Sequence, residues 1–131
     1  FIEGNSDGYF QFQLSQAPVR VGLTYQEVDF EDITPFRLVL NFNGSAFIGG
    51  TQALGPGGHQ VGDFFRIRHY AATNTVQFQK RQEIFDTDGS SLGQDYVSFH
   101  THSTLTNGND LFFDVSLQNI GCRINDTIIV T

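Results

Sequence analysis

The sequence predicts an all-β domain, built as an antiparallel sandwich or barrel. Apolar and polar residues alternate with a period of two in roughly nine short runs, which is the spacing of strands that bury one face. Turn-forming residues separate the runs, and 14 Gly accompany frequent Asn, Thr and Gln with hardly any Lys. No stretch shows the periodicity of an amphipathic helix, so a helical bundle is not expected.

The clearest pair of strands lies within residues 62–81. Phe65 and Ile67 alternate with arginines, and Val76 and Phe78 alternate with glutamines, so each strand has one apolar and one wet face. We expect this hairpin to be central, with further strands on both sides. Its apolar face is expected to enter a core rich in Phe, of which the chain has 14.

The remaining strands follow the same alternation along the chain. Residues 8–14 and 19–25 are expected to pair as a hairpin, and Asn43-Gly44 is a strong hairpin signal between two further runs. The weakly alternating run 96–105 is expected to carry on one side Tyr96, Ser98, His100 and His102. The other expected strands are residues 36–42, 46–48, 111–117 and 124–130, with a loop over 49–62.

The composition limits the size of the fold and its partners. A chain of 131 residues fits a single domain, and because it opens at Phe1 we expect an excised or processed part of a longer protein. Seven Lys and Arg against 14 Asp and Glu give a formal net charge of -7, which repels phosphate backbones, so no nucleic-acid partner is expected. No apolar run approaches the ~20 residues of a membrane span, so membrane insertion is not expected.

Three segments carry a resemblance to a known family. They are VGLT at 21–24, VGDFFRI at 61–67 with NTVQFQK at 74–80, and LFFDVSL at 111–117 closing on GCRIN at 121–125. In this order they resemble the concanavalin A-like lectin and glucanase jelly-roll modules of bacterial adhesins, secreted glycan-active proteins and phage tail fibres. The resemblance covers about residues 8–130 and implies a two-sheet jelly-roll sandwich over residues 1–131.

Two departures from the family pattern stand out. The family's Lys-Asn-Gly turn is replaced here by Lys80-Arg81-Gln82. The short joint before the late strand is replaced by residues 86–110, which we expect to be a loop-rich insertion. Long insertions often carry function, so this segment is a candidate for it.

The resemblance implies a non-catalytic extracellular recognition module that binds glycans or a cell-surface receptor. The expected location is outside the cell, on the cell surface or on a virion, as in the head of an adhesin or fibre. A homo-oligomer such as a trimer suits that role, because several weak sites acting together multiply affinity. The alternative from a different class is a structural assembly domain of a fibre or surface layer.

An acidic run offers a catalytic alternative. Glu27, Asp29 and Glu31 place three carboxylates at two-residue spacing, which resembles the catalytic strand of jelly-roll β-glucanases. By that resemblance Glu27 would be the nucleophile, Asp29 its electrostatic partner and Glu31 the acid/base of a small retaining glycoside hydrolase. A solvated acidic edge is the simpler interpretation, because Asp32 breaks the alternation and the chain has no Trp to line a cleft. We therefore expect no catalysis.

Two further motifs suggest metals. Asp86, Asp88 and Asp95 form an oxygen-rich stretch around Gly89, but the Glu that would complete an EF-hand spacing is missing. An ordinary Asp-Gly turn is the simpler interpretation, so no cofactor is expected and calcium is the alternative. Two histidines on one strand face can also bind metals, but solvent-facing or hydrogen-bonded side chains are more common.

The polar face of the central hairpin is the main candidate for ligand binding. Guanidinium groups, amides and an aromatic edge suit sugar hydroxyls and acidic sugars. The loop region after residue 100 is the second candidate. A wet outer face of a sandwich would look much the same, so a purely structural interpretation stays open. The expected ligand-binding residues are Arg66, Arg68, Tyr70, Gln77, His100, His102, Asn107 and Asn109.

Overall fold

The computed structural model describes residues 2, 6–24, 37–73, 75–103, 112–116 and 123–130. Within these residues the chain forms ten strands and no helix. The strands are β1 (Gly8–Gln16), β2 (Val19–Thr24), β3 (Arg37–Leu40), β4 (Ala46–Ile48), β5 (Thr51–Leu54), β6 (Phe64–Tyr70), β7 (Thr75–Phe85), β8 (Ser91–Ser103), β9 (Phe112–Ser116) and β10 (Arg123–Val130).

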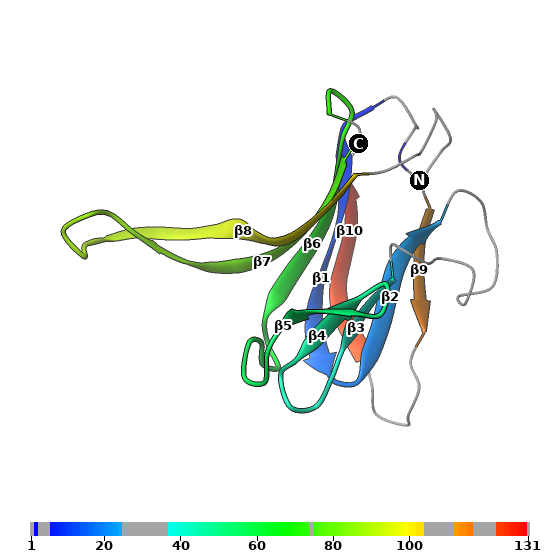
Figure 1. Cartoon of the computed structure of the whole chain (residues 1–131), viewed down its shortest axis with the longest axis horizontal. Helices are drawn as coiled ribbons and strands as arrows, with labels where there is room; N and C mark the ends of the chain where they lie inside the picture. The colour runs from blue at the N-terminus through cyan, green and yellow to red at the C-terminus, as the bar shows by residue number, and fades with distance from the viewer. Residues whose placement is uncertain are drawn as a thin grey trace.

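The strands form two antiparallel sheets that face each other (Figure 1). The first sheet has the order β10-β1-β6-β7-β8 and the second has the order β5-β4-β3-β2-β9. This arrangement confirms the predicted all-β, two-sheet sandwich. No helix that could span a bilayer occurs in the part of the chain that the structure describes.

The central hairpin is confirmed in place and in register. Strands β6 and β7 pair with Ile67 opposite Phe78, and β1 and β8 flank them in the first sheet. Phe65, Ile67, Val76 and Phe78 are all fully buried, as their alternation predicts. Each such side chain contributes about 1.5–3 kcal/mol through its removal from water, which is an upper figure for a chain that unfolds to a compact state.

The core lies between the two sheets. The Phe12 and Phe65 rings stack with their centres 5.5 Å apart. From the second sheet, β2 and β3 bring aliphatic side chains against these rings, so the Phe-rich layer and the aliphatic layer meet at the middle of the sandwich. The main fully buried residues of β1, β2 and β3 are Phe10, Phe12, Leu14, Val19, Val21 and Leu40.

The predicted pairing of the first two strands is wrong. Strand β1 pairs with β6 and β10 in the first sheet, whereas β2 pairs with β3 and β9 in the second. The chain crosses from one sheet to the other at Ala17 and Pro18. Alternation reports which face of a strand is buried, and both strands bury a face in the same core, so it does not report which strand lies alongside.

The Asn43-Gly44 hairpin is confirmed between β3 and β4. The expected loop over residues 49–62 also contains a strand, because β5 pairs with β4 at the edge of the second sheet. Its four residues are half-buried or exposed, which explains why no clear apolar pattern marks it.

The segment expected as a loop-rich insertion is largely a strand. Residues 86–90 form a turn and β8 begins at Ser91, while residues 104–110 lie outside the described part. The hairpin of β7 and β8 extends well beyond the sandwich (Figure 1). We call residues 82–95 the ribbon. Its polar, glycine-containing sequence forms strands without an apolar face, because each strand satisfies the backbone of the other.

Candidate ligand-binding face

The outward side of the first sheet gathers arginine, tyrosine and glutamine side chains. The register places Arg66 between Gln11 and Gln79, and in the next row Arg68 lies between Tyr9 and Gln77. Polar residues at alternate positions of three neighbouring strands therefore meet on one surface. We call this surface the Arg/Tyr face, and it comprises Tyr9, Gln11, Arg66, Arg68, Tyr70, Gln77, Gln79 and Tyr96.

Arg66 is held at the centre of the Arg/Tyr face. Its Cζ lies 3.9 Å from the centre of the Tyr9 ring and 3.8 Å from the centre of the Tyr96 ring. Its Nη2 and Nε donate to Gln11 Oε1 at 2.7 and 3.2 Å. A cation between two aromatic faces is stabilised by about 0.5–2 kcal/mol per ring, more as water is excluded. Burial raises the pKa of Tyr96, against an opposing effect of Arg66, so this phenol stays protonated at neutral pH.

Arg68 is less engaged than Arg66. Its Cζ lies 4.8 Å from the Tyr70 ring centre and 5.6 Å from that of Tyr9. Its Nε is buried, yet it has no hydrogen-bond partner among the described residues. Buried polar groups in native proteins are nearly always paired, so Arg68 is less fully satisfied than Arg66. Because its Nε is covered, a ligand would contact the outer nitrogens of the guanidinium.

An open acceptor accompanies this open donor. Gln79 donates from Nε2 to Gln77 Oε1 at 3.0 Å and to the Tyr70 hydroxyl at 3.4 Å. Its Oε1 is buried and lacks a partner within the described residues. The face thus holds one unsatisfied guanidinium N–H and one unsatisfied amide oxygen in neighbouring rows, both covered by the surrounding side chains.

The Arg/Tyr face is cationic although the chain is acidic overall. Arg66, Arg68 and Arg81 lie on the outward side of β6 and β7, and Arg81 Cζ is 5.7 Å from the Phe64 ring centre. No Asp or Glu occurs in β1, in β6, in β7 up to Arg81 or in β8 from Tyr96 onward. The sequence of β10, at the edge of the same sheet, does contain Asp126. The three arginines nevertheless give the centre of this face a local positive charge in a chain of net charge -7.

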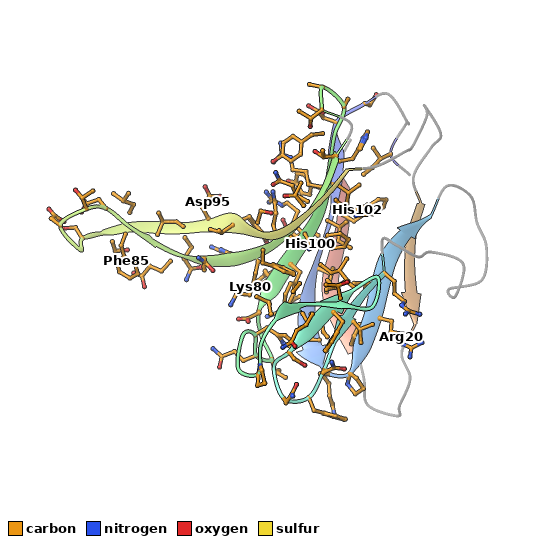
Figure 2. All side chains as sticks on the ribbon, in the orientation of Figure 1. Arg20, Lys80, Phe85, Asp95, His100 and His102 are labelled. Carbon is orange, nitrogen blue, oxygen red and sulfur yellow. The ribbon has the colours of Figure 1, made fainter. Side chains whose placement is uncertain are left out.

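The prediction that His100 and His102 share a face with Tyr96 is wrong. Ser98 lies opposite Gln79, but His100 lies opposite Phe78, so the strand holds one extra residue, Phe99, at this point. Such a β-bulge exchanges the two sides of a strand. Tyr96 therefore points outward, while the two histidines lie on the core side of the sheet (Figure 2).

The two histidines form an aromatic row with the core. The His100 ring centre is 5.9 Å from that of Phe78, and it stacks on His102 at 6.4 Å with an interplanar angle of 13°. Burial, and to a lesser extent His102, lower the pKa of His100. The two rings pack on the core side of β8 and do not join the Arg/Tyr face.

The acidic residues expected as a calcium alternative do not converge. Asp86 Oδ1 accepts from Asp88 N at 2.8 Å, and Asp88 Oδ1 accepts from Ser90 N at 2.8 Å, so both cap the turn at the end of the ribbon. Side-chain hydrogen bonding with Asp86, followed by the bonds from Ser90, lowers the pKa of Asp88 to about 2. Asp95 lies opposite Gln82, away from that turn (Figure 2). No group of three or more His, Cys, Asp and Glu suited to a metal ion occurs among the residues described.

Several predicted site residues fall outside the described residues. They are the catalytic alternative Glu27, Asp29 and Glu31 and the ligand candidates Asn107 and Asn109. The glycosidase alternative therefore stays a prediction.

Four residues of the Arg/Tyr face were not among the expected ligand-binding residues: Gln79 on the central hairpin, and Tyr9, Gln11 and Tyr96 on the flanking strands. Each is polar at an outward position of an alternating run, which is a detectable signal. Only the pairing of β1 with β6 and the bulge in β8 bring Tyr9, Gln11 and Tyr96 to Arg66, and neither is visible in local sequence. No protein family, no curated protein and no solved structure matches this chain.

Proposed function

We propose that this domain is a non-catalytic module that recognises acidic glycans through the Arg/Tyr face. The observation that supports this most is the cluster of Arg66 and Arg68, with Arg81 on the outward side of β7 beyond them. Arg68 is the less engaged of the two arginines of the face, since its Nε has no hydrogen-bond partner among the described residues. A guanidinium group binds carboxylates and sulfates well, because two of its N–H groups can donate in parallel to two oxygens of the anion.

The neighbouring groups suit the rest of a sugar ring. Tyr70 and Tyr9 offer ring faces beside Arg68, against which the C–H face of a pyranose can stack. Gln77, whose Oε1 accepts from the buried Gln79, offers its amide nitrogen as a donor to a sugar hydroxyl. Arg66 is already fixed by two rings and Gln11, so it supplies charge and rigidity, whereas Arg68 supplies the direct contact.

The same proposal includes a concanavalin A-like jelly-roll topology and an extracellular setting. The supporting observation for the topology is nested pairing, in which β1 lies beside β10 and β2 lies beside β9 in the opposite sheet. Two Greek keys wrapped on each other produce such nesting. The extracellular setting follows from the proposed ligand, since acidic glycans coat cells and virions.

Isothermal titration with a panel of oligosaccharides tests the proposal. The panel contains sialyllactose, trigalacturonate and a heparin tetrasaccharide, with lactose and maltotriose as uncharged comparisons. We expect binding of at least one acidic member, weakened by added salt because surface charges are screened. The Arg68→Gln variant should lose about tenfold in affinity for that member.

Arg20→Gln is the matched control, because Arg20 lies in β2 of the other sheet. It should retain the affinity of the parent. Absence of binding to every acidic oligosaccharide at millimolar concentration would falsify the proposal. Equal losses in Arg68→Gln and Arg20→Gln would also overturn it, because the effect would then reflect net charge alone.

A second candidate function, assembly with further copies of the chain, is favoured by the ribbon. The ribbon stands clear of the sandwich (Figure 1), and Phe85 and Leu92 on it are 58% and 65% exposed. A two-stranded ribbon with no third layer is marginal in water on its own, and large exposed apolar side chains mark interaction sites.

The negative charge of the ribbon favours a positively charged partner surface. It has no Lys or Arg, and its four carboxylates are those of Glu83, Asp86, Asp88 and Asp95. This acidic ribbon complements the cationic Arg/Tyr face of another copy. Sedimentation equilibrium of the full chain tests this candidate, with an oligomer expected that dissociates in Phe85→Ser and at high salt. A monomer at all concentrations would exclude the self-assembly candidate. Glycan binding would then be the remaining proposal for the Arg/Tyr face.

A further inference from the structure

A hollow of about 540 Å³ opens on the second sheet, where the turn after β3 meets β5. Its volume lies within the ~300–1,000 Å³ range of small-molecule sites. It belongs to the other layer of the sandwich from the Arg/Tyr face and shares no residue with that face. Its lining includes Pro18, Asn41, Phe42, Asn43, Phe47 and Gln52.

The apolar part of the hollow is aromatic. Phe42 is 76% exposed, the most exposed large hydrophobic side chain among the described residues. Phe47 lies between the buried Ala46 and Ile48 in β4, so the alternation turns its ring outward, toward the hollow. Exposed aromatic rings in a concave site provide a stacking surface for an apolar ligand face.

The polar part of the hollow consists of amides. Asn41 Nδ2 donates to Ser45 Oγ at 3.1 Å, and Asn43 Oδ1 accepts from Ser45 N at 3.0 Å and from Ser45 Oγ at 2.6 Å. These bonds fix both amides and leave Asn41 Oδ1 and Asn43 Nδ2 without a partner among the described residues. Gln52, whose Nε2 donates to Leu54 O at 3.3 Å, adds a third amide, and no charged side chain of a described residue lines the hollow.

The rim of the hollow is built before any ligand arrives. Gly57 N donates to Asn43 O at 2.7 Å and His59 N donates to Gly44 O at 3.0 Å, so the loop after β5 is tied to the turn after β3. His59 also lies with Nε2 2.9 Å from Ser45 O, to which it donates. A ligand that enters a preformed site avoids the entropic cost of ordering loops.

We propose that this hollow is a second saccharide site, which binds an uncharged pyranose unit. A pyranose presents one apolar C–H face and a rim of hydroxyls, which match the two Phe rings and the three amides respectively. Amides both donate and accept, as hydroxyls require, whereas a charged ligand would find no counter-ion here. The inference is independent of the acidic-glycan proposal, because it depends on other residues and another ligand class.

Amide chemical-shift titration of the ¹⁵N-labelled full chain tests the inference. The probes are cellotetraose and triacetylchitotriose, both uncharged. We expect shifts confined to residues 41–47 and 52–59, with saturation in the millimolar range. Phe42→Ala should weaken the binding about tenfold, and Gln52→Ala should weaken it in the same direction. Because both side chains are exposed, both variants should retain the dispersed spectrum of the parent.

Phe85→Ala is the matched control, since it removes an exposed phenylalanine far from the hollow, on the ribbon. It should bind the probes like the parent, and so should Arg68→Gln, which affects only the acidic-glycan site. No shift at residues 41–59 with either probe overturns the inference. An equal loss in Phe42→Ala and Phe85→Ala also overturns it. Loss of neutral-sugar binding in Arg68→Gln would merge the two sites and contradict their independence.

Discussion

The guanidinium carbon of Arg66 lies 3.8 Å from the centre of the Tyr96 ring, and this contact joins the middle of the first sheet to the base of the ribbon. We predict that Tyr96→Ala lowers the free energy of unfolding by about 1 kcal/mol, because it removes one of the two rings that enclose the cation. Tyr96→Phe keeps the ring and should behave like the parent. Urea unfolding monitored by circular dichroism measures both.

The same pair of variants reports on binding. If Arg66 supplies charge and rigidity to the Arg/Tyr face, Tyr96→Ala should also weaken acidic-glycan binding, whereas Tyr96→Phe should not. A parent-like affinity in Tyr96→Ala would show that Arg66 needs no such support.

Gly44 occupies a position that only glycine tolerates. Its φ is +84°, and a Cβ there would lie 2.7 Å from Gly57 N and 2.7 Å from His59 O, both backbone atoms. Gly50 has a similar φ of +87°, but a Cβ there would meet nothing within 4 Å. We predict a loss of about 1 kcal/mol for Gly50→Ala, from conformation alone, and about 3 kcal/mol for Gly44→Ala, from conformation and clash.

Denaturant unfolding of the two glycine variants provides the comparison, since their difference isolates the clash. Gly44→Ala should also lose the neutral-sugar shifts, because the loop after β5 can no longer dock on the turn. Equal stability losses would mean that the loop moves aside at no cost.

Two histidines make stability depend on pH. Burial lowers the pKa of His59, more than the Ser45 carbonyl and Asp63 raise it, and burial also lowers the pKa of His100. In the unfolded chain these histidines have the ordinary pKa of about 6.5. Their contribution to the free energy of unfolding is therefore fully present above that pH. This stabilisation is lost as the pH falls from about 6.5 through the lower pKa values of the folded state.

Urea unfolding at pH values between 8 and 4.5 checks this dependence. We expect a decline in stability that starts near pH 6.5, and a shallower decline in His59→Gln. The contribution of Asp88 is separate, since its lowered pKa affects stability only below about pH 4. An unchanged slope in His59→Gln would remove this histidine as a cause.

The ribbon should be dispensable for folding. Gln82 and Asp95 lie opposite each other, so an Asn-Gly turn can replace residues 83–94 and close the shortened hairpin. No residue of the ribbon belongs to the hydrophobic core as described, so the free energy of unfolding should change by less than about 1 kcal/mol. Tyr96 remains, so acidic-glycan binding should persist, while any self-association should disappear. A large loss of thermal stability would contradict this separation.

Period-two alternation predicted much of the fold because burial of one strand face is a local property. It identified the inward positions of the central hairpin correctly, including Phe65 and Phe78. It failed on the neighbours of strands, because β1 and β2 bury their faces in one core while belonging to different sheets. Strand pairing depends on contacts between distant parts of the chain, which no short window contains.

The candidate site was predicted in part for the same reason. Arg66, Arg68 and Gln77 lie on the two strands of one local hairpin, so their shared face follows from the alternation. Tyr9 comes from a distant strand, and the bulge at Phe99 reverses the sides of β8 at a point that the sequence marks only by weak alternation. A single extra residue thus moved His100 to the core side and left Tyr96 beside Arg66.

We expect backbone amides in the ribbon to exchange with solvent much faster than those in the two sheets. Interstrand bonds over residues 82–95 have water on both faces and no core above them, so they open without disturbing the sheets. We expect the amides of β6, next to the fully buried Phe65 and Ile67, to exchange only when the whole sandwich opens. Deuterium uptake should therefore be fast in the ribbon and slow in the strands of the sandwich. A partner that binds the ribbon would be detected as slower uptake over residues 82–95.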